Sequence, residues 1–163
     1  MKVLVIGSGG REHAICYAFN KSVKIDELFC ANGNAGIAEI AKCIPIKHDE
    51  IERLAEFASR NSIDLTFPGG ETPLALGVVD EFGSRGLRII GPGKDASQLE
   101  ASKSFAKDFM ARHSVPTAKY VTADSPASAA AVLSAGEFGD ESVPVVVKAD
   151  GLAAGKGVVV AAD

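Results

Sequence analysis

The first 95 residues repeat one pattern, in which a short apolar run ends at a turn and a helical pattern follows. The apolar runs lie at residues 2–6, 27–31, 64–67 and 88–90, and glycine-rich turns follow them. Parallel neighbouring strands need a long connection, so strands that alternate with helices at this spacing predict a parallel sheet with right-handed crossovers. We therefore expect an α/β fold, a doubly wound parallel sheet, over this part of the chain.

Apolar residues at helical spacing fill the segments between these runs. They predict helices over residues 12–21 and 51–61, and Asp49 is the expected cap of the second helix. Proline suits the first turn of a helix, so a single helix is expected from Pro73 to about Gly83.

The chain beyond these helices predicts the start of a second domain. Ser102 is the expected cap within a helical stretch over residues 99–110, and Ser125-Pro126 marks another helix start. Two strand-like runs then follow at residues 143–149 and 158–162. We expect a first domain over residues 1–119, with its following helices, and an incomplete second domain over residues 120–163.

Composition narrows the range of partners. Acidic residues number 21 and basic residues 17, spread along the 163 residues, so a basic field for nucleic acid is not expected. The three cysteines are widely spaced and predict reduced apolar side chains rather than a disulfide framework or a metal site. A signal-peptide pattern and an 18-residue apolar stretch are both missing, so we expect a cytoplasmic protein with no membrane partner.

The turn Gly7-Ser8-Gly9-Gly10 stands between a predicted strand and a predicted helix. Backbone N–H groups at a helix N-terminus favour a phosphate group, and Arg11 adds positive charge there. A tight turn that binds nothing is the alternative. A dinucleotide fingerprint needs a third glycine where Glu12 stands and an acidic residue after the second strand, where Asn32 and Gly33 follow instead. A nicotinamide cofactor is therefore disfavoured.

Three turns of this kind are expected at one edge of the sheet. Residues 7–10, 33–36 and 69–70 each follow a predicted strand. Because open α/β sheets bind ligands beyond the carboxyl ends of their strands, we expect the three turns to form one pocket. Each histidine lacks a spaced partner, so none predicts a metal site, and a structural role is favoured for His13.

The segment from Gly151 to Gly157 resembles a phosphate loop but departs from the Walker pattern. Only three residues separate Gly151 from Gly155-Lys156, one fewer than in the Walker pattern. In addition, Gly157 stands where that pattern has serine or threonine. A hairpin loop whose amides and Lys156 cover nucleotide phosphates fits better. Lys148 ends an apolar strand, where a lysine either extends to solvent or binds a charged ligand.

Five ordered motifs together resemble the phosphoribosylamine–glycine ligase family, also called glycinamide ribonucleotide synthetases, which are ATP-grasp enzymes. The motifs are Gly7-Ser-Gly-Gly-Arg-Glu-His-Ala14, Gly33-Asn-Ala-Gly36, Gly69-Gly-Glu-Thr-Pro-Leu74, Gln98-Leu-Glu-Ala-Ser-Lys103 with Phe105-Ala-Lys-Asp-Phe-Met110, and Val147-Lys-Ala-Asp-Gly-Leu-Ala-Ala-Gly-Lys-Gly157. The resemblance implies a Rossmann-like pre-ATP-grasp domain followed by the truncated start of an ATP-grasp α+β lobe.

The resemblance also implies a reaction of de novo purine biosynthesis. ATP, glycine and 5-phosphoribosylamine give glycinamide ribonucleotide, ADP and phosphate through a glycyl phosphate. Lysines and Mg²⁺ or Mn²⁺ stabilise the transferring phosphoryl oxygens in such chemistry, and the metal ligands are expected beyond residue 163. The full-length family enzyme is expected to be monomeric.

Site residues are implied by position in the motifs. The residues implied to face phosphoribosylamine are Gly9, Gly10, Arg11, Glu12, Asn34, Gly36 and Glu71. Those implied to bind the nucleotide are Lys103, Lys148, Gly151, Gly155, Lys156 and Gly157. No residue is assigned to the catalytic step itself.

The length implies that the chain is an N-terminal fragment without ligase activity of its own, because family members have about 420 residues. Two alternatives of other classes remain open. One is an NAD-dependent oxidoreductase domain, argued only from the first glycine turn. The other is a stand-alone phosphosugar-binding module with a vestigial tail. A further ATP-grasp ligase of purine synthesis is a third alternative, but such enzymes lack the Arg-Glu-His-Ala stretch at this place.

Overall fold

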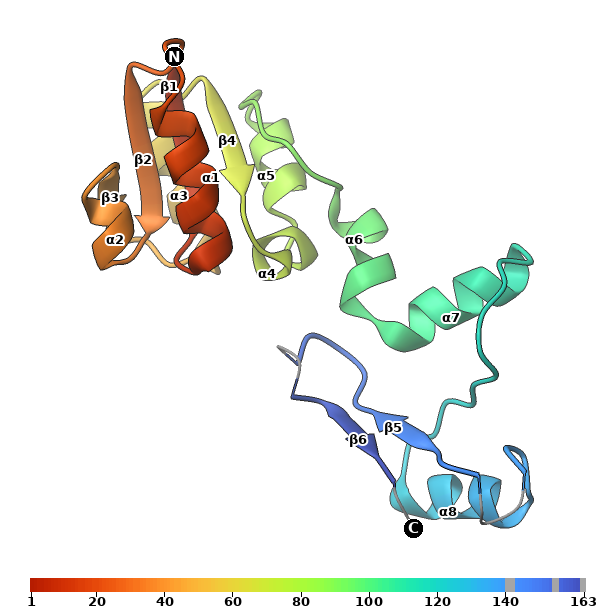
Figure 1. The fold of residues 1–163 in the computed structure, drawn as a ribbon. Coiled ribbons are helices and arrows are strands. Elements are labelled where there is room, and N and C mark those ends of the chain that lie inside the picture. Colours follow the sequence, from red (N-terminus) through yellow and green to blue (C-terminus); the bar gives the residue numbers. More distant parts are fainter. Residues whose placement is uncertain (140–142, 154–155, 162–163) are drawn as a thin grey trace. The chain divides into compact units, whose positions relative to one another are not determined.

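The computed structural model describes residues 1–139, 143–153 and 156–161. The chain forms two compact units, Met1–Ala101 and Ser102–Asp163. The sequence predicted a first domain that extends to residue 119, whereas residues 102–119 belong to the second compact unit in the structure. Each unit is described by itself below (Figure 1).

The first unit is built on a four-stranded parallel sheet with the strand order β3-β2-β1-β4 (Figure 1). Its strands are β1 (Lys2–Gly7), β2 (Glu27–Asn32), β3 (Lys42–Ile44) and β4 (Leu65–Pro68). The predicted parallel sheet is confirmed. The sequence did not predict β3, because this edge strand has three residues and two of them, Lys42 and Cys43, are exposed.

Helices cover both faces of the sheet, as a doubly wound fold requires. One face packs against α1 (Gly10–Asn20) and α2 (Ala35–Ala38), whose buried residues Cys16 and Ile37 contact the odd-numbered positions of β1. The other face packs against α3 (Ile51–Arg60) and α5 (Val78–Ser84). Strands buried on both faces explain why β1 is apolar from Val3 onward rather than alternating.

Two helix predictions in the first unit are wrong. Asp49 does not cap α3: the N-cap position is Glu50, whose carboxylate instead accepts a hydrogen bond from the Lys47 amide at 2.7 Å and pairs with Arg53. The single helix expected from Pro73 is two helices, α4 (Glu71–Ala75) and α5. They are separated at Gly77, whose φ of +91° lies in the left-handed region that ends a helix.

The run predicted as a strand at residues 88–90 forms only an isolated parallel bridge between Ile89 and Thr66. The Thr66 amide donates to the Arg88 carbonyl at 2.9 Å, and the Ile90 amide donates to the Thr66 carbonyl at 3.1 Å. Pairing stops there because the next bond of the ladder needs an amide at position 68, and Pro68 has none. Helix α6 (Lys94–Ala101) then completes the first unit.

The second unit contains α7 (Lys103–Arg112), α8 (Pro126–Ser134) and an antiparallel hairpin of β5 (Val146–Lys148) and β6 (Val158–Val160). The predicted cap Ser102 is confirmed, since its hydroxyl accepts from the Phe105 amide at 3.1 Å. The predicted helix start at Ser125-Pro126 is also confirmed, and there the Ser125 hydroxyl accepts from the Ser128 amide at 3.1 Å. None of the described residues of this unit is buried. Among all the described residues, the structure has no helix long and apolar enough to cross a membrane.

Candidate functional site

The three glycine-rich turns lie at the same edge of the sheet, as predicted. Strand register places Gly7 beside Asn32 and Ile6 beside Pro68, so the carboxyl ends of β1, β2 and β4 are level. The Gly33 amide donates to the Gly7 carbonyl at 3.1 Å and the Gly69 amide donates to the Ile6 carbonyl at 2.9 Å. The connections that leave the neighbouring strands β1 and β4 lead to opposite faces of the sheet, through α1 and through α4 and α5. This point is the topological switch where such sheets bind ligands.

A cavity of about 160 Å³ opens at this switch point. Two of the three turns line it, together with one histidine from the loop before α3. Its lining residues are Ile6, Gly7, Ser8, Gly9, Glu12, His48, Gly70, Glu71, Thr72 and Pro73. The turn at residues 33–36 adjoins the first turn but does not line the cavity, so the prediction of one pocket formed by all three turns is wrong for this turn.

A larger hollow of about 360 Å³ lies at the other end of the strands, where Glu27 and Leu28 begin β2 and Lys42 begins β3. Ligands of open α/β sheets bind at the carboxyl edge. We therefore place the candidate site of the first unit at the smaller cavity.

Arg11 links the first turn to the third. One guanidinium nitrogen donates to the Gly69 carbonyl at 2.9 Å and to a Glu71 carboxylate oxygen at 2.8 Å. The Arg11 hydrogen bond lowers the pKa of Glu71 below its usual range, and Glu71 in turn raises the pKa of Arg11. Both residues were predicted for the site, and the structure brings them together as an ion pair.

Glu12 is buried between the turns rather than extended from them. Its side chain is 7% exposed and one carboxylate oxygen accepts a hydrogen bond from the Gly9 amide at 2.6 Å. A Cβ atom at Gly7 would lie 2.5 Å from the Glu12 Cγ atom, and one at Gly69 would overlap the same atom. Glycine is required at both positions because the Glu12 side chain occupies that space.

The second turn is fastened to the first. The Asn34 side-chain amide donates to the Ser8 carbonyl at 2.8 Å, and its oxygen accepts from the Ile37 amide at 3.0 Å to cap α2. At Gly36 a Cβ atom would lie 2.6 Å from the His13 ring, so the imidazole packs directly on the backbone there. Gly10 has open space around it.

His48 is a cavity residue that the sequence did not predict. It lies in the loop between β3 and α3, far in sequence from the glycine turns, and it has no spaced partner that would mark it. Its position follows from β3, and a three-residue edge strand carries too little pattern to be recognised.

In the second unit, Asp150 joins the start of the glycine-rich loop to the N-terminus of α7. Its carboxylate accepts hydrogen bonds from the amides of Lys103 at 2.6 Å, Gly151 at 2.9 Å and Ser104 at 3.3 Å. It also accepts from the hydroxyls of Ser104 at 2.5 Å and Ser102 at 3.2 Å. These donors, the Ser104 hydroxyl foremost, hold the pKa of Asp150 well below its usual range.

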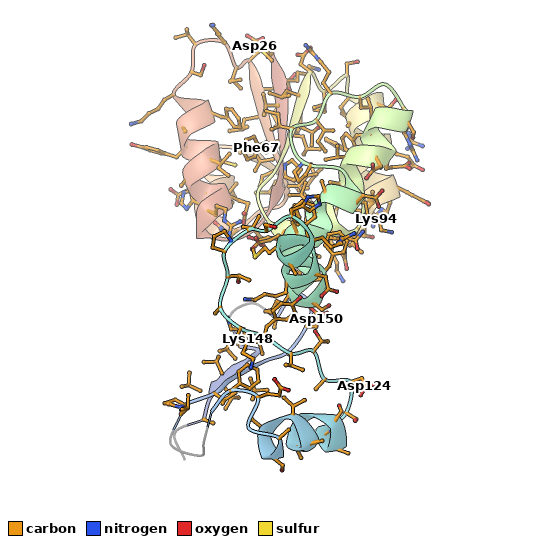
Figure 2. The ribbon with its side chains drawn as sticks, turned by 90° about the vertical axis from the view of Figure 1, so that its right-hand side faces the viewer. Asp26, Phe67, Lys94, Asp124, Lys148 and Asp150 are labelled. Atoms are coloured by element: carbon orange, nitrogen blue, oxygen red, sulfur yellow. The ribbon has the colours of Figure 1, made fainter. Side chains whose placement is uncertain are left out.

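Two of the predicted nucleotide residues, Lys103 and Gly151, meet at this junction. The Lys103 ammonium donates to the Gly151 carbonyl at 2.8 Å. Lys148 is exposed at the end of β5, two residues before Asp150 (Figure 2). At the other end of the loop Lys156 is exposed, and the Gly157 carbonyl accepts from the Ala149 amide at 2.8 Å. Gly155 lies outside the described residues.

Metal ligands do not gather in the described part of the chain: no three histidine, cysteine, aspartate or glutamate side chains lie close enough there to hold an ion.

Known proteins that resemble this chain match it over its whole length. The chain is 52% identical over 163 residues to a phosphoribosylamine–glycine ligase of Xanthomonas campestris, covering 99% of this chain and 37% of that protein. It is 48% identical to one from Caldanaerobacter subterraneus, covering 100% of this chain and 38% of that protein. The chain therefore spans a little over a third of the length of these curated relatives.

Solved structures agree with the fold. The phosphoribosylamine–glycine ligase of Thermotoga maritima superposes with a TM-score of 0.71 at 30% identity, covering 100% of this chain and 36% of that one. A biotin carboxylase domain of Hydrogenobacter thermophilus 2-oxoglutarate carboxylase superposes with a TM-score of 0.75 at 21% identity, covering 98% of this chain and 37% of that one, which shows the shared fold alone.

Family models divide the chain in two. The model of the phosphoribosylglycinamide synthetase N domain matches residues 1–100, and the model of the ATP-grasp (A) domain of the same synthetase matches residues 101–163. The chain therefore belongs to the phosphoribosylglycinamide synthetase family.

Proposed function

We propose that the chain is the N-terminal part of a ligase that joins 5-phosphoribosylamine and glycine at the expense of ATP. The products are glycinamide ribonucleotide, ADP and phosphate, and the reaction belongs to de novo purine biosynthesis. The observation that carries the proposal is the family match over the whole chain, at about 50% identity to relatives of that name. The convergence of three glycine turns at the switch point of the sheet supports it.

The two units divide the substrates. The first unit binds the phosphoribosylamine through Gly9, Gly10, Asn34 and Gly36 of the first two turns and through Glu71, which directly follows the third turn. Support comes from the cavity at the carboxyl edge, where two of these turns meet. Arg11 and Glu12 hold the turns together and present them to the substrate.

The second unit contributes to the binding of ATP. Lys103, Lys148 and Lys156 supply positive charge for the phosphates, and the glycine-rich loop from Gly151 to Gly157 supplies backbone amides. The junction at Asp150 supports this assignment, because it fixes the start of the loop to the helix that contains Lys103.

ATP chemistry of this kind uses a divalent cation, and we propose Mg²⁺ or Mn²⁺ with its ligands beyond residue 163. The cation neutralises developing charge on the transferring phosphoryl group. The proposed enzyme is cytoplasmic and monomeric, with small molecules rather than nucleic acid or membranes as partners.

Glycine becomes an acyl donor in the proposed mechanism by phosphorylation of its carboxylate. A carboxylate is a poor acyl donor, whereas the acyl phosphate has a good leaving group. The amine of phosphoribosylamine then attacks the carbonyl carbon, a C–N bond forms, and phosphate leaves. Positioning and electrostatic stabilisation are the tasks of the protein in this chemistry.

The purified 163-residue chain provides the test. We expect saturable binding of ribose 5-phosphate, and no steady ADP release from ATP, glycine and 5-phosphoribosylamine, because the chain spans just over a third of its relatives. ADP release that depends on both substrates would show that this length suffices. Absence of ribose 5-phosphate binding would contradict the substrate assignment of the first unit.

An NADH titration separates the proposal from an oxidoreductase domain. Glu12 stands where a dinucleotide fingerprint has glycine, and its buried side chain occupies the space beside the first turn. We expect no saturable change in NADH fluorescence, and saturable binding would favour the oxidoreductase alternative.

A further inference from the structure

The Glu12 carboxylate is buried at the wall of the cavity and forms no salt bridge with the described residues. Its side chain is 7% exposed and lines the cavity, and one oxygen accepts from the Gly9 amide. Among the ion pairs formed by the described residues, none includes Glu12; the nearby guanidinium of Arg11 pairs with Glu71 instead. A buried carboxylate is costly unless hydrogen-bond donors or a cation satisfy it.

The rest of the cavity wall also presents more carboxylate acceptors than positively charged side chains to a ligand. The titratable lining residues are Glu12, Glu71 and His48, and Arg11 is not among the lining residues. Moreover, the Gly9 amide, which a phosphate on the first turn would use, already donates to Glu12. A phosphate in the cavity would therefore meet a carboxylate where a donor is needed.

We propose that this cavity binds the hydrogen-bond-donating part of the sugar substrate, its hydroxyl and amine groups, through the Glu12 carboxylate, and that it excludes the phosphate group. The inference rests on the proposed function and adds the orientation of the substrate. The volume of about 160 Å³ is well above the roughly 10–15 Å³ that one water needs, so several polar groups fit. Donors from the substrate complete the hydrogen bonding that Gly9 alone begins.

The test asks whether removal of the Glu12 charge weakens or tightens ligand binding. Ribose 5-phosphate and, separately, inorganic phosphate are titrated into the 163-residue chain and its Glu12→Gln variant, with binding followed by amide NMR. Glutamine keeps the size of the side chain and an oxygen for the Gly9 amide, so the turn is retained. The matched control is Glu52→Gln, an exposed glutamate in the first turn of α3.

We expect Glu12→Gln to weaken ribose 5-phosphate binding about tenfold or more, as the loss of hydrogen bonds to a charged acceptor predicts. Inorganic phosphate should not bind more tightly to this variant, and the control should match the parent chain. If the cavity held phosphate instead, removal of the carboxylate would tighten the binding of both probes. Tighter or unchanged binding of ribose 5-phosphate to Glu12→Gln overturns the inference.

A second variant guards against a folding defect. Glu12→Asp keeps the charge but withdraws the carboxylate by one methylene, so it should also weaken the binding of ribose 5-phosphate. If Glu12 only repelled the phosphate group, this variant would lose no affinity for ribose 5-phosphate. Thermal unfolding of each variant checks that the first unit is folded. If the parent chain binds neither probe, the sugar assignment of the proposed function fails together with this inference. If the parent chain binds ribose 5-phosphate and Glu12→Gln binds it more tightly, only the inference fails.

Discussion

Replacement of Asp150 by alanine should loosen the junction between the glycine-rich loop and α7. The carboxylate accepts from two amides at the N-terminus of α7 and from the Ser104 hydroxyl. Loss of a capping side chain costs about 0.5–2 kcal/mol, and hydrogen bonds to charged groups lie near the upper end. Asp150 is exposed, so solvent screens its charge. We therefore expect the replacement to lower the local stability of the junction by about 1–2 kcal/mol.

Amide hydrogen exchange measures this loss at the affected residues. A cost of about 1–2 kcal/mol corresponds to roughly 5- to 30-fold faster exchange at Lys103 and Ser104, because each 1.4 kcal/mol is a factor of ten. The control is Asp124→Ala, which removes an acceptor of the Ser128 hydroxyl at the start of α8. It should leave the α7 amides unchanged. Unaltered exchange at Lys103 and Ser104 in Asp150→Ala would refute the role of this carboxylate as the junction.

Three further perturbations test the local contacts. Gly69→Ala should lower the free energy of unfolding of the first unit by about 1–3 kcal/mol, because the new methyl group overlaps Glu12. Gly70→Ala should change it little, because the space around Gly70 is open. Equal thermal unfolding of the two variants would contradict this prediction. The pKa of Asp150 is lowered in the folded chain, so its stabilisation is present above the ordinary aspartate pKa of about 3.9 and is lost only as the pH falls below it. Amide exchange at Ser104, corrected for the intrinsic pH dependence, should therefore show constant protection from pH 7 to 5. A loss of protection in that window would argue against a lowered pKa of Asp150. Arg11→Met should return the pKa of Glu71 toward its ordinary value, as followed by carboxyl NMR titration, and an unchanged pKa would mean that Arg11 is not its cause.

Local patterns predicted the parts of the fold that depend on neighbours in sequence. The apolar runs of β1 and β2, the turns after them, the cap Ser102 and the helix start at Ser125-Pro126 each depend on a few adjacent residues. The shared edge of the three turns followed from parallel topology, because strand ends of one sense lie together.

The features that the sequence did not reveal depend on contacts between distant residues. Asp150 bonds to residues 46 to 48 positions earlier, and no spacing rule connects them. Likewise, the burial of Glu12 depends on Gly69 in the turn after β4, and a charged residue beside a glycine turn is ordinarily expected to face solvent. The break at Gly77 was missed because the apolar pattern continues through it.

The most direct test of the central claim, that the turns of the first unit form one site for a sugar phosphate, is a residue-resolved NMR titration with ribose 5-phosphate. Gly9 and Gly36 lie in the first and second turns, and Glu71 directly follows the third. We predict that the amides of all three shift along one binding curve with a single Kd. Shifts confined to one turn, or separate curves for the three amides, would contradict the claim.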